Sequence, residues 1–231
     1  MLGDPDSKII EEYGVLNQEA TGMQKGFARP GYFFIDTKGI IREKFFEAKY
    51  RERLSGNSLL SKLFPELGQE VTETAEAPHL QLALEQSDRT GIPGSRITLV
   101  AELRLPPEVH VYAPGTQGYK PIKLVIDPMP VMEFKPVVYP QSTTLYLPVI
   151  KERVPVFEGT FRISEDLKVN TGSEFWGSLG KDGKIFTITG KLEYQACDKT
   201  ICYTPSSVPV KWQLQVVPLD RTRAPVDIRH K

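Results

Sequence analysis

Hydrophobic and polar residues alternate over most of the chain between residues 80 and 218, in short segments separated by proline and glycine turns. Side chains of a β-strand point to its two faces in turn, so this alternation predicts strands with one buried face. Since no helical stretch lies between the segments, the pattern predicts a mainly β protein built on an antiparallel β-sandwich. The apolar positions of the clearest segments are Ile97, Leu99, Ala101, Leu103, Leu105; Phe157, Gly159, Phe161, Ile163; Phe186, Ile188, Leu192, Tyr194; and Val208, Val210, Trp212, Leu214, Val216.

Residues 1–67 have a different texture, in which helix-like and strand-like segments alternate. The continuous apolar run 31–36 predicts a strand, which a short turn joins to a second strand over 40–47. Residues 50–64 predict one helix, or two short helices broken at Ser55. An unbroken apolar strand is typical of burial on both faces, so this part indicates a partial α/β layer.

Two polar segments frame the sandwich. Residues 68–79 are polar and aperiodic, which is typical of a linker, and residues 219–231 form a charged tail. The chain has 29 basic and 29 acidic residues, which gives no electrostatic reason to expect nucleic acid or an anionic membrane as a partner. No apolar run approaches the roughly 20 residues needed to span a bilayer, and the first residues carry no secretion signal. We therefore expect no direct insertion of this chain into a membrane.

The chain has only two cysteines, Cys197 and Cys202, with four residues between them. This spacing suits a hairpin loop, which can bring the two Cα atoms within the disulfide range of roughly 4.4–6.8 Å. Strand parity places Cys197 on the face opposite Tyr194 and Ala196, and we expect that face to be polar and accessible.

The cysteine pair has three possible roles: a structural disulfide, a redox-active couple or part of a metal site. A stapling disulfide around so small a loop would contribute on the order of 2 kcal/mol. A redox-active couple has the same spacing, so spacing alone leaves these two open. A metal site is a poor third interpretation, because no histidine stands at zinc-like spacing; the histidines are His79, His110 and His230. No cofactor is expected.

The stretch from Tyr194-Gln195-Ala196-Cys197 to Cys202-Tyr203-Thr204-Pro205 resembles the N-terminal domain of the bacterial DsbD thiol–disulfide interchange family. His110–Gly115 and Val154–Gly159 are similar to other recurring stretches of these domains, and the likeness covers roughly residues 80–217. It implies an immunoglobulin-like sandwich over residues 80–218, in which Cys197 and Cys202 are the redox-active pair. Two departures are a loop of four rather than five residues and Thr204 where a proline is usual.

The resemblance also implies roles for residues around the pair. Family members shield their cysteines with a cap loop that bears an aromatic residue, and its counterpart by position is 131–141, with Glu133, Phe134 and Tyr139. By the same analogy, Cys202 is the first residue to react with a partner. The residues expected to flank the pair are Tyr194, Asp198, Lys199 and Tyr203; the lysine would favour a thiolate and the aspartate would oppose it.

Residues 2–64 resemble the second half of a thioredoxin-fold domain of the peroxiredoxin and thiol-reductase kind. Tyr13-Gly14-Val15 and Arg29–Asp36 carry this likeness, and Pro30 falls where such folds often have a cis-proline. The half that would supply a catalytic cysteine is absent, since no cysteine precedes residue 197. We expect a truncated product, an excised fragment, or a half-domain that is completed by another chain.

These observations predict thiol–disulfide exchange in the bacterial cell envelope, in a periplasmic or other extracytoplasmic compartment. The expected partners are thioredoxin-fold redox proteins or a membrane electron-donor domain. The alternative is an immunoglobulin-like interaction module whose disulfide is purely structural. The sequence carries no signal for an oligomeric state.

Overall fold

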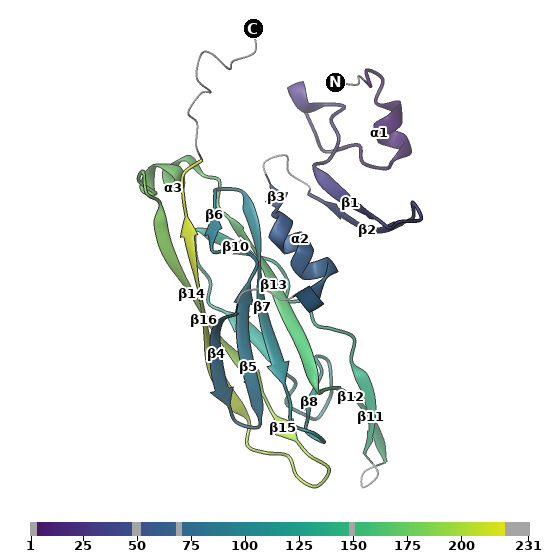
Figure 1. Ribbon diagram of the computed structural model, residues 1–231, viewed down its shortest axis with the longest axis vertical. Coiled ribbons are helices and arrows are strands. Elements are labelled where there is room, and N and C mark those ends of the chain that lie inside the picture. The colour runs from purple at the N-terminus through teal and green to yellow at the C-terminus, as the bar shows by residue number, and fades with distance from the viewer. Residues whose placement is uncertain (1–3, 48–51, 68–70, 148–150, 220–231) are drawn as a thin grey trace.

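The computed structural model describes residues 4–47, 52–67, 71–147 and 151–219 (Figure 1). From residue 71 onward most of the described residues lie in antiparallel strands, which confirms the prediction of a mainly β sandwich. Residues 220–231 of the expected charged tail lie outside the described residues.

One layer of the sandwich is a six-stranded sheet, in which β7 pairs with β13 on one side and with β5 on the other. The strand order is β10-β13-β7-β5-β4, and the short β3 pairs in parallel with the start of β7. The strands of this sheet are β3 (Arg53–Leu54), β4 (Val71–Ala77), β5 (Leu80–Gln86), β7 (Ser95–Arg104), β10 (Met132–Phe134) and β13 (Thr160–Val169).

The facing layer consists of two four-stranded sheets, with the orders β6-β16-β14-β9 and β11-β12-β8-β15. β15 directly follows β14 in the chain, so the chain passes from the first of these sheets to the second at that point. The strands of this layer are β6 (Thr90–Gly91), β8 (His110–Tyr112), β9 (Lys123–Ile126), β11 (Thr143–Leu147), β12 (Glu152–Glu158), β14 (Lys184–Tyr194), β15 (Ala196–Cys197) and β16 (Ser206–Val216). A short helix, α3 (Ser173–Ser178), connects β13 to β14.

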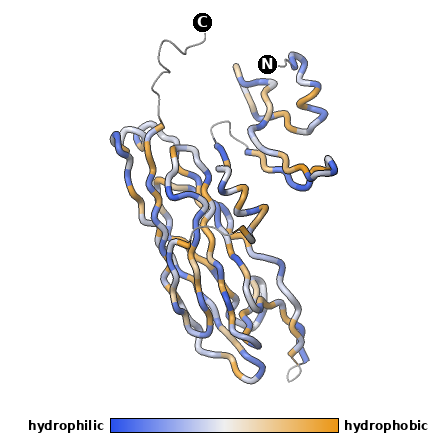
Figure 2. The backbone as a smooth tube through the Cα atoms, in the orientation of Figure 1, coloured by the Kyte–Doolittle hydropathy of each residue, from blue (hydrophilic) through white to orange (hydrophobic). Residues whose placement is uncertain are grey.

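The hydrophobic core lies between the layers and follows the alternation in the sequence. In β16, every second residue from Val208 to Val216 is buried, and Figure 2 shows apolar and polar positions alternating along the strands of the sandwich. The indole N–H of Trp212 donates to the carbonyl of Glu85 at 2.9 Å, so its one polar atom is paired inside the core. Burial of each large apolar side chain stabilises the fold by about 1.5–3 kcal/mol.

Residues 71–77, expected to lie in a linker, form the edge strand β4. β4 pairs with β5 from Val71 opposite Glu85 to Ala77 opposite Leu80, with a register irregularity near its start. An edge strand tolerates polar side chains because one of its edges is exposed. The polar, aperiodic sequence of this segment showed no strand pattern although it forms a strand. The linker prediction is therefore wrong for these residues.

The segment that precedes the sandwich contains α1 (Lys8–Glu12), the 3₁₀ turn η1 (Gly22–Gln24), and the hairpin of β1 (Gly31–Ile35) and β2 (Ile41–Phe46). The hairpin confirms the predicted strand, turn and strand. It forms a separate two-stranded sheet in which no residue of β1 is buried, so the expectation of burial on both faces is wrong. Its apolar side chains pack on one another instead, with ring centroids of Phe33 and Phe46 4.9 Å apart.

Pro30 is not a cis-proline. No cis peptide bond occurs among the residues that the structure describes, so the sequence-based prediction is wrong. A trans bond is the lower-energy form even before proline. The carbonyl of Pro30 accepts a hydrogen bond from the Glu47 amide at 2.9 Å, which closes the open end of the β1–β2 hairpin. The relation of this segment to a thioredoxin fold stays a prediction.

Helix α2 (Gly56–Leu63), followed by the turn η2 (Pro65–Leu67), covers part of the outer face of the six-stranded sheet (Figure 1). It begins after Ser55, whose hydroxyl accepts from the Ser58 amide at 2.9 Å and so caps the helix. Residues 50–51 of the predicted helix over 50–64 lie outside the described residues, and β3 takes Arg53 and Leu54, so the helix is shorter than expected. Polar contacts hold α2 on the sheet, among them an ion pair of Lys62 with Asp166 at 2.9 Å.

The segment 157–163, predicted as one strand, belongs to two strands in different sheets. Phe157 lies in β12 and Phe161 in β13, and Gly159 between them has a φ of 64°. Glycine adopts this left-handed conformation without steric cost, which allows the chain to turn between the sheets. The two phenylalanine rings stack with centroids 4.8 Å apart.

We expect Gly190→Ala to destabilise the sandwich by about 1–3 kcal/mol. Gly190 lies in β14 opposite Ile126 of β9, and a Cβ at this position would stand 2.3 Å from the carbonyl oxygen of Val125. Even a methyl group therefore requires β9 to move. Urea unfolding measures the loss, with Gly177→Ala in α3 as the control, because its Cβ would meet nothing within 4 Å. A Gly190→Ala variant as stable as the wild type would contradict this packing.

Candidate functional site

The two cysteines form a disulfide that closes a hairpin, as their spacing predicted. Cys197 and Cys202 are bonded and face each other as an antiparallel bridge, with their Cα atoms 4.0 Å apart, slightly closer than the expected range. Inside the loop the Asp198 amide donates to the carbonyl of Ile201 at 2.9 Å, and beyond it the Tyr203 amide donates to Ala196 at 2.8 Å. Backbone pairing thus continues on both sides of the disulfide.

The position of Cys197 follows the predicted parity, but its accessibility does not. Tyr194 and Ala196 lie in the main core and Cys197 lies on the opposite face, as expected. That face is covered here, because β15 leaves the sheet of β14 and pairs with β8. Only 1% of Cys197 is exposed, so the prediction of an accessible Cys197 is wrong.

A small second hydrophobic cluster provides this cover. Cys197 packs there with Tyr112, Val154 and Val156, and the partly buried members are Tyr119, Leu145 and Leu147. Cys202, in contrast, is an exposed residue. The two ends of the disulfide therefore have different environments: Cys197 is enclosed by apolar side chains, whereas Cys202 is an exposed residue.

Two tyrosines stand beside the disulfide. The hydroxyl oxygen of Tyr112 lies 3.6 Å from Sγ of Cys202, and since a disulfide sulfur carries no hydrogen, the phenol is the donor. Burial raises the pKa of the Tyr112 hydroxyl, so it remains protonated at neutral pH. The ring of Tyr119 stacks on that of Tyr112 with centroids 4.2 Å apart, and its hydroxyl donates to Glu152 at 3.3 Å.

The residues expected to form a cap loop lie elsewhere. Glu133 and Phe134 belong to β10, which pairs with β13 at the far end of the other layer (Figure 1). Tyr139 packs on the main core, and its hydroxyl accepts from the Leu124 amide at 3.3 Å. Their placement in this structure does not agree with a cap over the disulfide, because strand pairing carries the segment 132–138 along β13.

Asp198 organises the loop between the cysteines. Its carboxylate accepts from the Thr200 amide and hydroxyl, both at 2.7 Å, from the Ile201 amide at 2.9 Å and from the Tyr203 hydroxyl at 2.7 Å. These hydrogen bonds, above all that from Tyr203, hold the pKa of the Asp198 carboxyl well below its usual range. The ionised Asp198 carboxylate therefore stabilises the conformation of the loop.

The other predicted flanking residues tie the hairpin to its surroundings. Lys199 pairs with Glu108 at 2.5 Å, so its charge is already compensated. The ring of Tyr203 stacks on that of His79 with centroids 3.6 Å apart. The Tyr194 hydroxyl donates to the carbonyl of Pro78 at 2.8 Å, and burial raises its pKa to about 12. The β4–β5 turn at residues 78–79 is thus part of the site, although the sequence placed it in a linker.

His110 is a further site residue that the sequence analysis did not predict, because no histidine stands at zinc-like spacing. It lies in β8 directly opposite Cys197, and 3% of it is exposed. Its Nε2 has no hydrogen-bond partner in the described part of the chain. The signal available in the sequence was its place two residues before Tyr112, which puts both side chains on one face of a strand.

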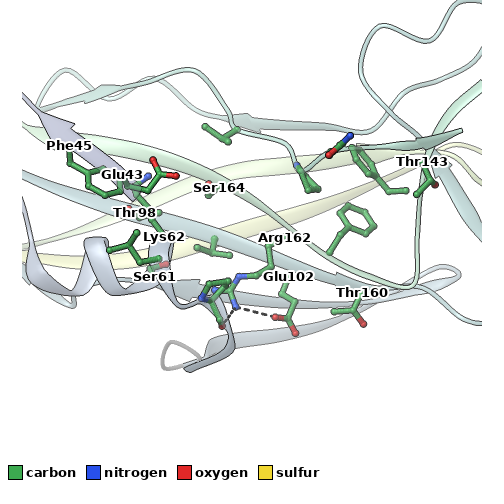
Figure 3. A pocket seen from close by; sticks show the side chains of 18 of the residues that line it. Glu43, Phe45, Ser61, Lys62, Thr98, Glu102, Thr143, Thr160, Arg162 and Ser164 are labelled. Carbon is green, nitrogen blue, oxygen red and sulfur yellow. Dashed lines mark hydrogen bonds and ion pairs between the residues drawn. The ribbon is translucent and has the colours of Figure 1, made fainter. Parts of the chain in front are cut away.

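A groove of about 1040 Å³ crosses the outer face of β7 and β13, beside α2 and the β1–β2 hairpin (Figure 3). The three basic side chains that line it are in ion pairs: Arg162 with Glu102 at 3.2 Å and with Glu85 at 2.5 Å, Lys62 with Asp166, and Arg42 with Asp36. Such mutual pairing is typical of a structural network that attaches α2 to the sheet. Within residues 4–47, 52–67, 71–147 and 151–219, no three His, Cys, Asp or Glu side chains converge as metal ligands.

Comparison with known proteins identifies the sandwich. Residues 81–212, more than half of the chain, match the family model described as "Thiol:disulfide interchange protein DsbD, N-terminal". The chain belongs to the DsbD N-terminal domain family. This assignment agrees with the immunoglobulin-like sandwich and with the disulfide, and it does not extend to residues 1–80.

Two solved structures are similar to parts of this DsbD-type chain. The N-terminal periplasmic domain of ScsB from Proteus mirabilis is 13% identical, with a TM-score of 0.39, and the match covers 62% of this chain and 51% of that one. The N-terminal domain of Neisseria meningitidis DsbD in the reduced form is 14% identical, with a TM-score of 0.34, covering 51% of this chain and 77% of that one. The chain thus matches about half the length of the ScsB structure. No curated protein matches it.

Proposed function

We propose that this domain exchanges its Cys197–Cys202 disulfide with the dithiol of a thioredoxin-fold protein, or of a membrane electron-donor domain, in the bacterial cell envelope. The observation that carries the proposal is the asymmetry of the disulfide: Cys202 is exposed, whereas Cys197 is 1% exposed. A structural staple has no need of an exposed end, but a partner thiolate needs access to one sulfur atom.

The exchange proceeds through a mixed disulfide. A partner thiolate attacks Sγ of Cys202, the bond between Cys202 and Cys197 breaks, and the electron pair leaves on Sγ of Cys197. The second thiolate of the partner then attacks its own mixed-disulfide sulfur and displaces Cys202. The partner dithiol becomes a disulfide and this domain becomes a dithiol; the reverse sequence passes the electrons onward.

Envelope location is part of the same proposal. A disulfide with an exposed end persists in an oxidising compartment, and the ScsB domain that this chain resembles is periplasmic. In the described part of the chain, no helix is long and apolar enough to cross a membrane.

A redox titration together with a transfer assay tests the proposal. We expect reduced thioredoxin, used as a probe partner, to reduce the oxidised domain, and we expect a reduction potential above about −300 mV. Alkylation followed by mass spectrometry counts the free thiols, and a variant with both cysteines replaced by serine is the control. A potential below about −300 mV with no transfer would instead support the alternative, an interaction module with a structural disulfide.

A further inference from the structure

The register of the strands places four reactive or charged residues in one cross-strand row. Glu158 of β12 lies opposite His110 of β8, His110 lies opposite Cys197 of β15, and Cys197 lies opposite Cys202. Directly opposite residues of antiparallel strands share a face, with Cβ atoms about 4.5–5.5 Å apart. The side chains of His110 and the buried Cys197 therefore leave neighbouring strands side by side on the same face.

His110 has an unused buried nitrogen in the disulfide form. Its Nε2 has no hydrogen-bond partner among the described residues, and the residue is 3% exposed. Buried polar atoms are nearly always paired, so an unpaired one calls for an explanation. The neighbouring sulfur is a weak acceptor with no hydrogen while the disulfide is closed. Reduction turns it into a thiol, which is a donor that Nε2 can accept from.

We propose that His110 is the proton acceptor of Cys197 in the reduced domain. This inference rests on the proposed function, since it concerns the resolving half of the same exchange. Cys197 is enclosed by the Tyr112, Val154 and Val156 side chains, and an apolar enclosure by itself disfavours a thiolate. A proton acceptor beside Cys197 offsets that cost.

In the mixed disulfide of Cys202 with a partner, Nε2 of His110 takes the proton from the Cys197 thiol. The Cys197 thiolate attacks Sγ of Cys202, the bond from Cys202 to the partner sulfur breaks, and the partner leaves with the electron pair. The partner thiolate is then protonated, and the imidazolium returns its proton to solvent. The net change is one thiol and one mixed disulfide converted into the internal disulfide and a partner thiol.

The charges around His110 support this role in opposite ways. Burial lowers the pKa of the imidazole, whereas the carboxylates of Glu158 and Asp198 raise it. The neutral ring is thus favoured while the disulfide is closed, and a thiolate alongside would add a third negative charge that favours the imidazolium. The titratable and charged groups on the packed elements are Glu108 and Tyr112 of the β8 segment, Glu152, Arg153 and Glu158 of β12, and Cys197, Asp198, Lys199, Cys202 and Tyr203 of the cysteine hairpin.

The test uses Cys202→Ser, in which Cys197 is the single thiol, and needs no partner protein. The absorbance of the thiolate near 240 nm is followed against pH in this variant and in the same variant carrying His110→Gln. We expect the glutamine to leave at least tenfold less Cys197 thiolate at pH 7. Glu174→Gln is the control, because Glu174 is an exposed residue of α3, at the opposite end of the sandwich from β15 (Figure 1), and it should leave the Cys197 titration unchanged. Equal thiolate fractions with and without His110 would overturn the inference.

A second measurement decides the matter if His110→Gln does not fold. The imidazole of His110 is titrated by NMR in the full wild-type chain, once oxidised and once reduced. We expect its pKa to be higher in the reduced protein, and the same pKa in both states would overturn the inference. Since neither readout involves exchange with a partner, a domain that fails to exchange with thioredoxin contradicts the proposed function without deciding the role of His110.

Discussion

The Cys197→Ser variant is expected to capture a thioredoxin-fold partner as a stable mixed disulfide, and the Cys202→Ser variant is not. In the first variant the remaining thiol is on Cys202, an exposed residue, and no second cysteine is present to release the partner. In the second variant the remaining thiol is on Cys197, which is 1% exposed and packed against Tyr112 and Val156. Access to the sulfur, more than its intrinsic reactivity, separates the two variants.

The probe is a thioredoxin whose resolving cysteine is replaced by serine and whose remaining cysteine carries a mixed disulfide with a small leaving thiol. The thiol of each domain variant attacks the thioredoxin sulfur and displaces that small thiol, and the captured adduct is measured. Non-reducing electrophoresis and intact mass give the yield of adduct against time, and we expect capture by Cys197→Ser to be at least tenfold faster. The double serine variant sets the background, and near-ultraviolet circular dichroism confirms that both single variants keep their packing. Equal rates, or faster capture by Cys197, would contradict the assignment of Cys202 as the sulfur that a partner attacks.

Ionisation of a single carboxyl group in the core, that of Glu165, is expected to lower the stability by about 3 kcal/mol as the pH rises from about 4.5 to 7. Glu165 lies in β13 among residues that face the interior, opposite Leu99 of β7, and only 6% of it is exposed. Its Oε2 atom has no hydrogen-bond partner within the described residues. Burial raises the pKa of this carboxyl from 4.5 to about 7.

The direction of the effect follows from proton binding. Between pH 4.5 and 7 the folded protein keeps the proton on Glu165 whereas the unfolded chain loses it, so each rise in pH favours unfolding. Below this window both states are protonated and the penalty vanishes. Above it the folded state must hold an unpaired carboxylate, and the full penalty is present.

Urea unfolding of the oxidised protein at pH 4.5 and pH 8 measures the effect, with Glu165→Gln as the test variant. Relative to the wild type, the glutamine variant should gain about 3 kcal/mol on passing from the lower to the higher pH, because its side chain does not ionise. Glu76→Gln, on the exposed side of the edge strand β4, is the matched control and should show no such gain. An identical pH dependence of Glu165→Gln and the wild type would show that Glu165 ionises without cost in the fold.

The alternation in the sequence was sufficient to predict the sandwich and much of its core. Each apolar position predicted in β16 is buried, and the same holds for those of β7 from Ile97 to Leu103. The spacing of the cysteines was sufficient to predict a closed hairpin. Both results depend on short-range geometry, because the period of a strand and the width of a turn are properties of a few consecutive residues.

Several features of the fold depended on partners far away in the sequence. Residues 71–77 became a strand because β5 offers an edge for pairing. In contrast, β1 pairs only with β2 among the described residues, and its phenylalanines are only half-buried. The segment 132–138, which contains Phe134, is hydrogen-bonded to β13 and does not lie over the cysteines. Composition and periodicity carry no information about these pairings.

By itself the sequence determined which face of its strand Cys197 occupies and that Cys202 stands opposite it. Only the tertiary structure decided that this face is covered and that Cys197 lies between His110 and the exposed Cys202. It also decided that the carboxyl group of Glu165 is enclosed in the core. The physical reason is that strand parity fixes the direction of a side chain, whereas its burial is fixed by the neighbouring strands and by the side chains they bring.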